Sequence, residues 1–370
     1  MTITLLWFAA ISVQAAPHPT KDTVDSLLHC IDTAIGQTDK YVQKKTDRID
    51  YLHTKLDKAE TLSAKYELSY QLYTEYLPFV NDSAIFYLEQ CTDIARKLND
   101  PSKTGGCLSL MALCCSNAGI YLESVSILKT IDPSQLNDID LGLYYYAYSH
   151  VSNELAYYGK FANMRKQYAV ASTRYFTLAQ QHLPSNHKYN YLSQEMMLHK
   201  HNNIKQSLSI NNQWLQQVQP GSTEYAIVAY YRYLDYKAMG DSIQMMYWLA
   251  ESVLSDVKNA VMDQGSVWEM ANQLMSRGDV DRSYRYICFT SDCADRFGSR
   301  QRLSHISPLL SRIAQVYKAK EERSNRSLRY TITAISILSL LLLIALAYVH
   351  RKRNQLAVTR DHLAQSNNQL

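Results

Sequence analysis

A ladder of turn positions recurs along most of the chain and constrains its fold more than any other feature. The turns fall at Phe79, Gly119, Gly159, Asn202, Gly240 and Gly278, which are 38 to 43 residues apart. Each turn lies between two stretches with helical periodicity, and Gly or Asn tolerates the left-handed backbone that ends a helix. One helix pair cannot bury its apolar face alone, so we expect neighbouring pairs to stack into an α-solenoid.

Each turn is followed, five residues later, by a residue placed to close the second helix onto the first. These residues are Ala84, Ser124, Met164, Ser207, Met245 and Ser283, and the small ones, Ala84, Ser124, Ser207 and Ser283, are predicted helix-crossing positions. The stretches AIFYLEQCTDIARKLND and LSLMALCCSNAGIYLESVSILKTI show the pattern most fully, and it is typical of tetratricopeptide repeats. The spacing exceeds the usual length of about 34 residues, so we expect extended helices or loops.

Composition agrees with an all-α fold. Apolar residues make up 46% of the 370 residues, whereas Gly (11) and Pro (8) are scarce, so the turn clusters of a sandwich or a doubly wound sheet are missing. We predict tetratricopeptide-like repeats over residues 61–317, preceded by an N-terminal helical cap over residues 16–60. The formal net charge of +4 is too small to indicate nucleic-acid binding, and we expect no direct contact with nucleic acid.

Two apolar segments predict export and membrane anchoring. Residues 1–15 are typical of a signal peptide, because an apolar core from Leu5 to Ile11 precedes the small residues of Val13-Gln14-Ala15. The alternative is a buried N-terminal helix, since no Lys or Arg stands ahead of the core. Residues 331–349 carry no charge, and as a helix they would extend over about 28 Å, enough to cross a bilayer.

Basic residues flank the predicted transmembrane helix on both sides, so charge alone does not orient it. A signal peptide would place residues 16–330 outside the cytosol, with residues 318–330 as a juxtamembrane segment and residues 350–370 inside. We therefore expect a single-pass protein of the cytoplasmic membrane with a periplasmic solenoid.

The segment after the predicted span has the beginning of a heptad pattern. Leu356, Leu363 and Leu370 are seven residues apart, as in one seam of a coiled coil. Fewer than three heptads do not form a stable coiled coil alone. We expect either a longer product or a partner, and the seam predicts a homodimer.

Catalytic and metal-binding motifs are not evident. His199 and His201 are two residues apart and would point to different faces of a helix, so we expect surface histidines. The seven cysteines contain no CxxC pair, and small buried side chains are the favoured interpretation. Tyrosine clusters around Tyr144 and Tyr230 could line a binding groove, although packing between helices is favoured. We expect no enzyme activity, no cofactor and no metal.

The chain resembles an uncharacterised family, common among Bacteroidetes, of exported tetratricopeptide-repeat proteins with one membrane span. The likeness rests on AIFYLEQCTDIARKLND, on Glu251 to Ile287, and on RKRNQLAVTRDHLAQSNNQL after the span. Longer members of that family continue into a cytoplasmic coiled coil and a region thought to act in transcriptional regulation. Nothing in this sequence corresponds to that last region.

The order of these parts indicates a receptor. We expect the solenoid to bind a protein or peptide and the span to carry that state inward, as the sensor part of a transcription regulator. The alternative is an envelope scaffold or assembly protein that does not signal.

Overall fold

The computed structural model describes residues 19–298 and 300–367. Within these ranges the chain forms fifteen α-helices and one short 3-10 helix, η1 (Pro133–Gln135), and no strand. The prediction of an all-α fold is confirmed. The chain divides into two compact units, Met1–Leu310 and Ser311–Leu370. The predicted signal peptide lies outside the described residues.

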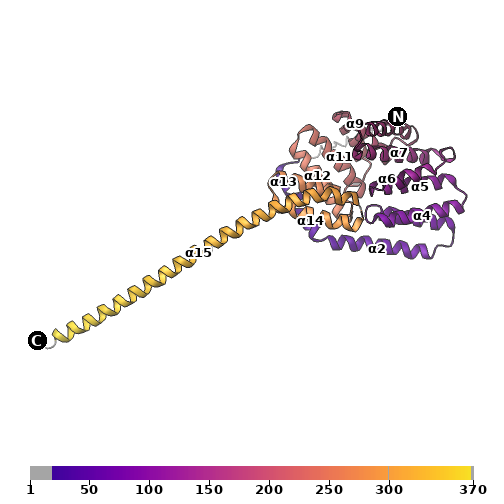
Figure 1. Ribbon diagram of the computed structural model, residues 1–370. Coiled ribbons are helices and arrows are strands. Elements are labelled where there is room, and N and C mark those ends of the chain that lie inside the picture. The colour runs from indigo at the N-terminus through magenta and orange to yellow at the C-terminus, as the bar shows by residue number, and fades with distance from the viewer. Residues whose placement is uncertain (1–18, 299, 368–370) are drawn as a thin grey trace, which may run out of the picture. The chain divides into compact units, whose positions relative to one another are not determined.

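The first unit begins with α1 (Lys21–Gly36) and α2 (Thr38–Asp57) and continues as six helix pairs (Figure 1). In chain order, the pairs are α3–α4 (Leu62–Tyr76, Asn81–Lys97), α5–α6 (Pro101–Asn117, Tyr121–Lys129), α7–α8 (Asp138–Tyr158, Ala162–His182), α9–α10 (Lys188–Lys200, Ile204–Leu215), α11–α12 (Thr223–Met239, Ser242–Lys258) and α13–α14 (Gly265–Ser276, Val280–Phe297). We number them one to six. Each pair encloses one of the six turn positions of the ladder.

Four of the turns have the same backbone conformation. Asn202 has φ +56°, and Gly119, Gly240 and Gly278 have φ between +76° and +85°. The amide of the next residue then donates to a carbonyl five residues back, for example Asn203 N to Leu198 O at 2.8 Å. This is a Schellman-type helix end, and it favours Gly or Asn because other side chains clash in the left-handed region.

The other two turns are built differently. Gly159 has φ −60° and ψ 134°, which departs from the left-handed backbone expected there. Glycine suits this position because a Cβ atom would lie 2.6 Å from the carbonyl oxygen of Leu155. Phe79 lies in the turn of pair one and packs its ring against the apolar core.

The small crossing residues are fully buried between the two helices of their pairs. Ala84, Ser124, Ser207 and Ser283 each have a relative exposure of 0%. Ser283 Oγ donates to the carbonyl oxygen of Ala271 at 2.7 Å, which joins the second helix to the first. Ser124 makes the equivalent bond in pair two at 2.7 Å. Met164 is 47% exposed and does not close pair three, because it is not buried between the helices.

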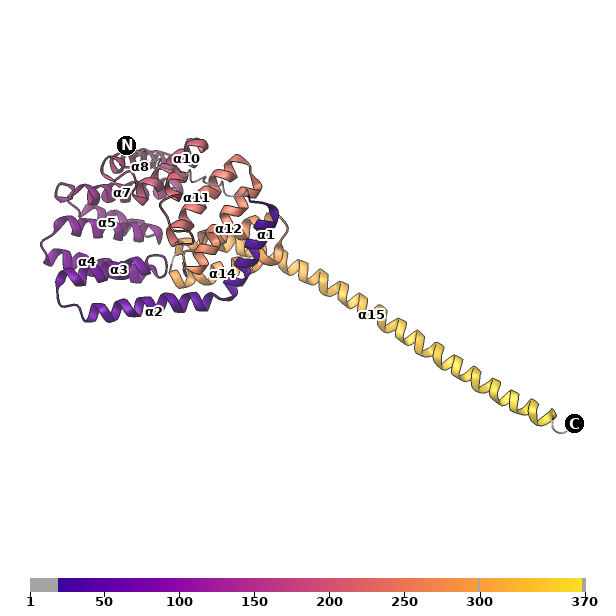
Figure 2. The same cartoon turned by 180° about the vertical axis from the view of Figure 1, so that it is seen from behind.

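The two ends of the solenoid meet. The residues of the expected N-terminal cap form α1 and α2; α2 packs on α3, whereas α1 packs on α12 (Figure 2). Asp32 on α1 accepts from Arg282 Nε at 2.9 Å and from Arg285 Nη2 at 3.0 Å, both on α14. Met262 N also donates to Pro78 O at 2.7 Å, which links pair six to pair one through the loop before α13. These contacts tie helices that lie more than 180 residues apart in sequence.

The second unit consists, in its described residues, of the greater part of α15 (Arg300–Asn367). This helix is long and apolar enough to cross a membrane, by length and composition, and its most apolar window is not buried. Apolar side chains there, such as Leu338 at 73% exposure, have no protein covering them. The coiled-coil seam is described only in part: Leu356 is exposed, while the side chain of Leu363 and all of Leu370 lie outside the described residues.

Candidate functional site

A cavity of about 350 Å³ lies among helices of three successive pairs. It is lined by α7 and α8 of pair three, α9 of pair four and α11 of pair five. The volume is at the lower end of the range for ligand sites, about 300–1,000 Å³, so it suits a small ligand or one or two side chains of a peptide.

The cavity wall is amphipathic. Its lining combines aromatic rings and thioethers with polar tips: Tyr146, Phe176, Tyr231, Met196, Met197, Ser149, Asn153, His150 and Lys200. Burial lowers the pKa of His150, which favours the neutral ring. Its Nδ1 atom lies 3.2 Å from Ser116 Oγ. Ser149 Oγ is already engaged, since it donates to the carbonyl oxygen of Ser172 at 2.9 Å. An apolar group with a few hydrogen-bonding atoms therefore matches this wall.

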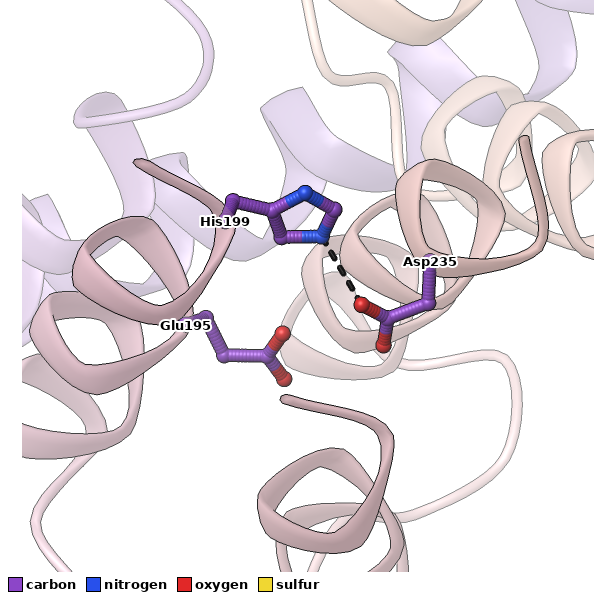
Figure 3. A group of neighbouring side chains, drawn as sticks. All are labelled: Glu195, His199 and Asp235. Carbon is purple, nitrogen blue, oxygen red and sulfur yellow. Dashed lines mark ion pairs between the residues drawn. The ribbon is translucent and has the colours of Figure 1, made fainter. Parts of the chain in front are cut away.

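Beside the cavity, α9 and α11 bring together three titratable side chains (Figure 3). Glu195 and His199 are four residues apart on α9 and so share one helix face. Asp235 reaches them from α11. Each side chain offers a donor atom, and these atoms lie within 4.8 Å of one another. His199 also lines the cavity, so the cluster and the cavity share a residue.

Glu195 is fully buried and is held by two hydrogen bonds from α10. Ser207 Oγ donates to Oε2 at 3.0 Å, and Asn211 Nδ2 donates to Oε1 at 2.8 Å. Burial raises the pKa of Glu195 to about 7, and the neighbouring charge of Asp235 adds to the shift. The two hydrogen bonds oppose the shift but do not cancel it.

Asp235 is the least satisfied member of the cluster. Its side chain has 0% exposure, and its Oδ1 lies 2.8 Å from Nε2 of His199. That distance makes an ion pair when the ring is protonated, but the contact lacks the alignment of a hydrogen bond, and neither oxygen of Asp235 has a hydrogen-bond partner. A buried carboxylate without a hydrogen bond is rare and unfavourable.

Glu195 and its partner Asn211 occupy positions that are apolar or small in several other pairs. Seven residues before the turn, pair four has Glu195, where pairs two and six have Ala112 and Ala271. Nine residues after the turn, it has the fully buried Asn211, where pair six has Ile287. Pair four thus has two polar side chains at buried positions that are apolar in pair six.

The structure departs from the expectation of a surface histidine at His199, which is partly buried and paired with Asp235. His201 is exposed, as expected. The cluster was missed because His199 was compared only with His201, while its partners lie four residues back and on another helix. The sequence signal for the cluster is Glu195, an acidic residue at the helix position where pairs two and six have Ala112 and Ala271.

The tyrosine clusters mainly pack between helices. Tyr144, Tyr146, Tyr225 and Tyr233 are buried, and the rings of Tyr146 and Tyr189 stack with centroids 4.4 Å apart. Tyr146 and Tyr231 also line the cavity. Most of the tyrosines in the two clusters are therefore packing residues, and Tyr146 and Tyr231 also form part of the cavity wall.

Six successive helix pairs, four of them with a buried small residue at the crossing, define a tetratricopeptide-type solenoid, which is a class of protein-interaction domain. The family model described as the SusR N-terminal TPR domain matches residues 35–308, most of the 370-residue chain. The chain belongs to this family. No curated protein matches it.

Proposed function

We propose that the solenoid recognises a protein or peptide outside the cytosol and that the chain reports this binding across a membrane, as the sensor part of a regulator. The observation that carries the proposal is the amphipathic cavity among pairs three, four and five. A peptide side chain inserted there contacts helices of three pairs at once. Binding would therefore change how these pairs pack on one another.

The membrane part of the proposal rests on α15. Its uncharged stretch, residues 331–349, is the proposed span, and the tail after it carries the heptad leucines. The proposed orientation, with the solenoid outside, depends on the expected signal peptide. In this arrangement the tail pairs with that of a second copy, and Leu356 lies in the dimer seam.

A crosslinking experiment in intact cells tests this coupling. A photo-crosslinking amino acid at Leu356 reports the dimer, and Asn153→Trp fills the cavity. Ser126→Trp is the matched control, because Ser126 is exposed on α6 and does not line the cavity. We expect the dimer yield to change at least about twofold with Asn153→Trp and not with Ser126→Trp. A dimer yield that neither variant alters would contradict the coupling.

The second candidate function is a scaffold that does not signal. The contacts of Asp32 with Arg282 and Arg285 favour it, because they tie the two ends of the solenoid and limit its opening. In that case, Asn153→Trp reduces partner binding to the solenoid while the crosslink at Leu356 stays unchanged.

A further inference from the structure

We propose that Glu195, His199 and Asp235 form a binding site for one divalent transition-metal ion. The inference concerns pair four and does not depend on the proposed function. The three side chains offer one nitrogen and two carboxylate oxygens, and these donor atoms lie within 4.8 Å of one another. Three such donors on two neighbouring helices are a common protein contribution to a metal site.

The distances suit an ion once the three side chains move closer around it. Metal–nitrogen and metal–oxygen bonds of about 2.0–2.2 Å place neighbouring ligand atoms roughly 3–4 Å apart. The Oδ1 atom of Asp235 is 2.8 Å from Nε2 of His199, so these two atoms need to separate by a few tenths of an ångström. Donor atoms elsewhere in the cluster are up to 4.8 Å apart and need to approach by up to about 1 Å. Both side chains point toward the same space as the carboxylate of Glu195 (Figure 3).

The charge balance of the cluster favours a cation. Glu195 and Asp235 are both fully buried, and within residues 19–298 neither forms an ion pair with Lys or Arg. The nearby guanidinium of Arg232 instead donates to Asn212 Oδ1 at 2.6 Å and lies over the ring of Trp248. A protonated His199 offsets one of these two charges at most. Buried carboxylates are costly without compensation, and a divalent ion would neutralise both.

The poorly satisfied carboxylate of Asp235 is the second sign of a ligand. Neither oxygen accepts a hydrogen bond, and the ion-pair contact of Oδ1 with His199 leaves Oδ2 without a partner, although the side chain is wholly shielded from solvent. Glu195, by contrast, is oriented by Ser207 and Asn211, as outer-shell groups orient a metal ligand. One carboxylate is thus held in place, and the other is available to coordinate.

The donor set indicates the class of ion. Imidazole nitrogen favours Zn²⁺ and its first-row neighbours, and carboxylates extend the range to Mn²⁺. Ca²⁺ is disfavoured because it prefers six to eight oxygen ligands. His199 lines the cavity and its side chain is 22% exposed, so the cluster adjoins solvent at this residue. A bound ion would link α9 to α11 and so fix pair four against pair five beside the cavity.

Metal titration of the full chain in detergent, without an affinity tag and after chelator treatment, tests the proposal. Zn²⁺ and Mn²⁺ are added separately as the chloride salts, and binding is followed by calorimetry and by metal content after dialysis. We expect one ion per chain and a rise in Tm of about 5 °C when the free ion is about 100 times its Kd.

Two ligand variants and one control make the result specific. His199→Ala and Asp235→Asn should each weaken binding beyond the about 10–100-fold expected for loss of an outer-shell partner. His201→Ala should bind normally, because His201 is exposed at the end of the same helix. Circular dichroism of the metal-free variants checks that they fold. If no ion binds, or if binding survives in both ligand variants, the cluster is an ion pair alone and the proposal is wrong.

Discussion

Pairs four and six have the same frame but differ at two buried positions, where pair four has Glu195 and Asn211 and pair six has Ala271 and Ile287. Both turn through a left-handed residue, Asn202 or Gly278, and both close through a buried serine, Ser207 or Ser283. In pair six that serine bonds a backbone carbonyl, whereas in pair four it bonds the carboxylate of Glu195. The two pairs thus share the turn and the crossing serine but differ in the buried group that the serine binds.

This difference indicates how a solenoid tolerates buried polar residues in a single helix pair. Each pair contacts mainly its neighbours, so an unfavourable interior in one pair is a local cost that the rest of the array tolerates. Pair four also borders the cavity through His199. We infer that its polar interior is retained for binding rather than for stability.

The largest effect should come from placing a polar residue of pair four at the apolar position of pair six. Ile287→Asn gives pair six the residue that pair four has at the same position. Ile287 is fully buried, so the change removes apolar packing and buries an amide, and we expect a loss of about 3–5 kcal/mol in the free energy of unfolding. Urea unfolding of the full chain in detergent, followed by circular dichroism, measures it. A loss below about 1 kcal/mol would mean that the interiors are interchangeable.

The reverse exchange in pair four should show strong coupling. Asn211→Leu alone removes the donor to Glu195 Oε1 and to Val228 O and one acceptor of Arg232, and should cost about 2–3 kcal/mol. Adding Glu195→Ala removes the stranded carboxylate, so the double variant should recover at least about 1 kcal/mol of that loss. A double-mutant cycle of urea midpoints gives the coupling energy, expected at about 1–3 kcal/mol. Simple additivity would speak against a connected polar core.

The crossing serines should differ by the partner they bond. Ser207→Ala removes a hydrogen bond to a carboxylate and should cost about 1.5–3 kcal/mol in unfolding free energy, whereas Ser283→Ala should cost about 0.5–1.5 kcal/mol. Urea midpoints of the two variants, measured side by side, provide the test. Equal losses would show that Glu195 gains nothing special from Ser207.

The smallest effect should lie at the turn, where the pairs agree. Asn202→Gly keeps a residue that accepts φ +56°, so unfolding free energy should change by less than about 0.5 kcal/mol. Gly278→Ala, at φ +85°, should cost about 1–2 kcal/mol. Thermal unfolding of both variants measures the contrast. A large loss with Asn202→Gly would show that the Asn side chain has a further role.

The repeat frame could be predicted from the sequence because its signals are local. A left-handed turn residue such as Gly240 lies within five positions of the contact it allows, and a small residue such as Ser124 bonds a partner only 12 positions back. The turn at Gly159 shows the limit of this reasoning. Glycine is favoured there because a Cβ atom would clash with the carbonyl oxygen of Leu155, and not because the backbone is left-handed.

The candidate site could be predicted only in part because it is assembled from separate helices. Asp235 lies 36 residues after His199, and nothing in the spacing indicates that α11 turns it toward α9. The closure through Asp32 and Arg282 spans 250 residues and depends on the curvature of the whole array. The heptad at Leu356 stays a prediction, as do the orientation and the homodimer.

Hydrogen exchange of the full chain, with and without added Zn²⁺, tests the central claim most directly. The account predicts that the amides of α9 and α10 are less protected than those of α13 and α14 in the metal-free protein. Added Zn²⁺ should slow exchange in α9 and α11 and leave α13 and α14 unchanged. Equal protection of the two pairs, unaffected by Zn²⁺, would contradict the view that pair four gives up stability for a binding site.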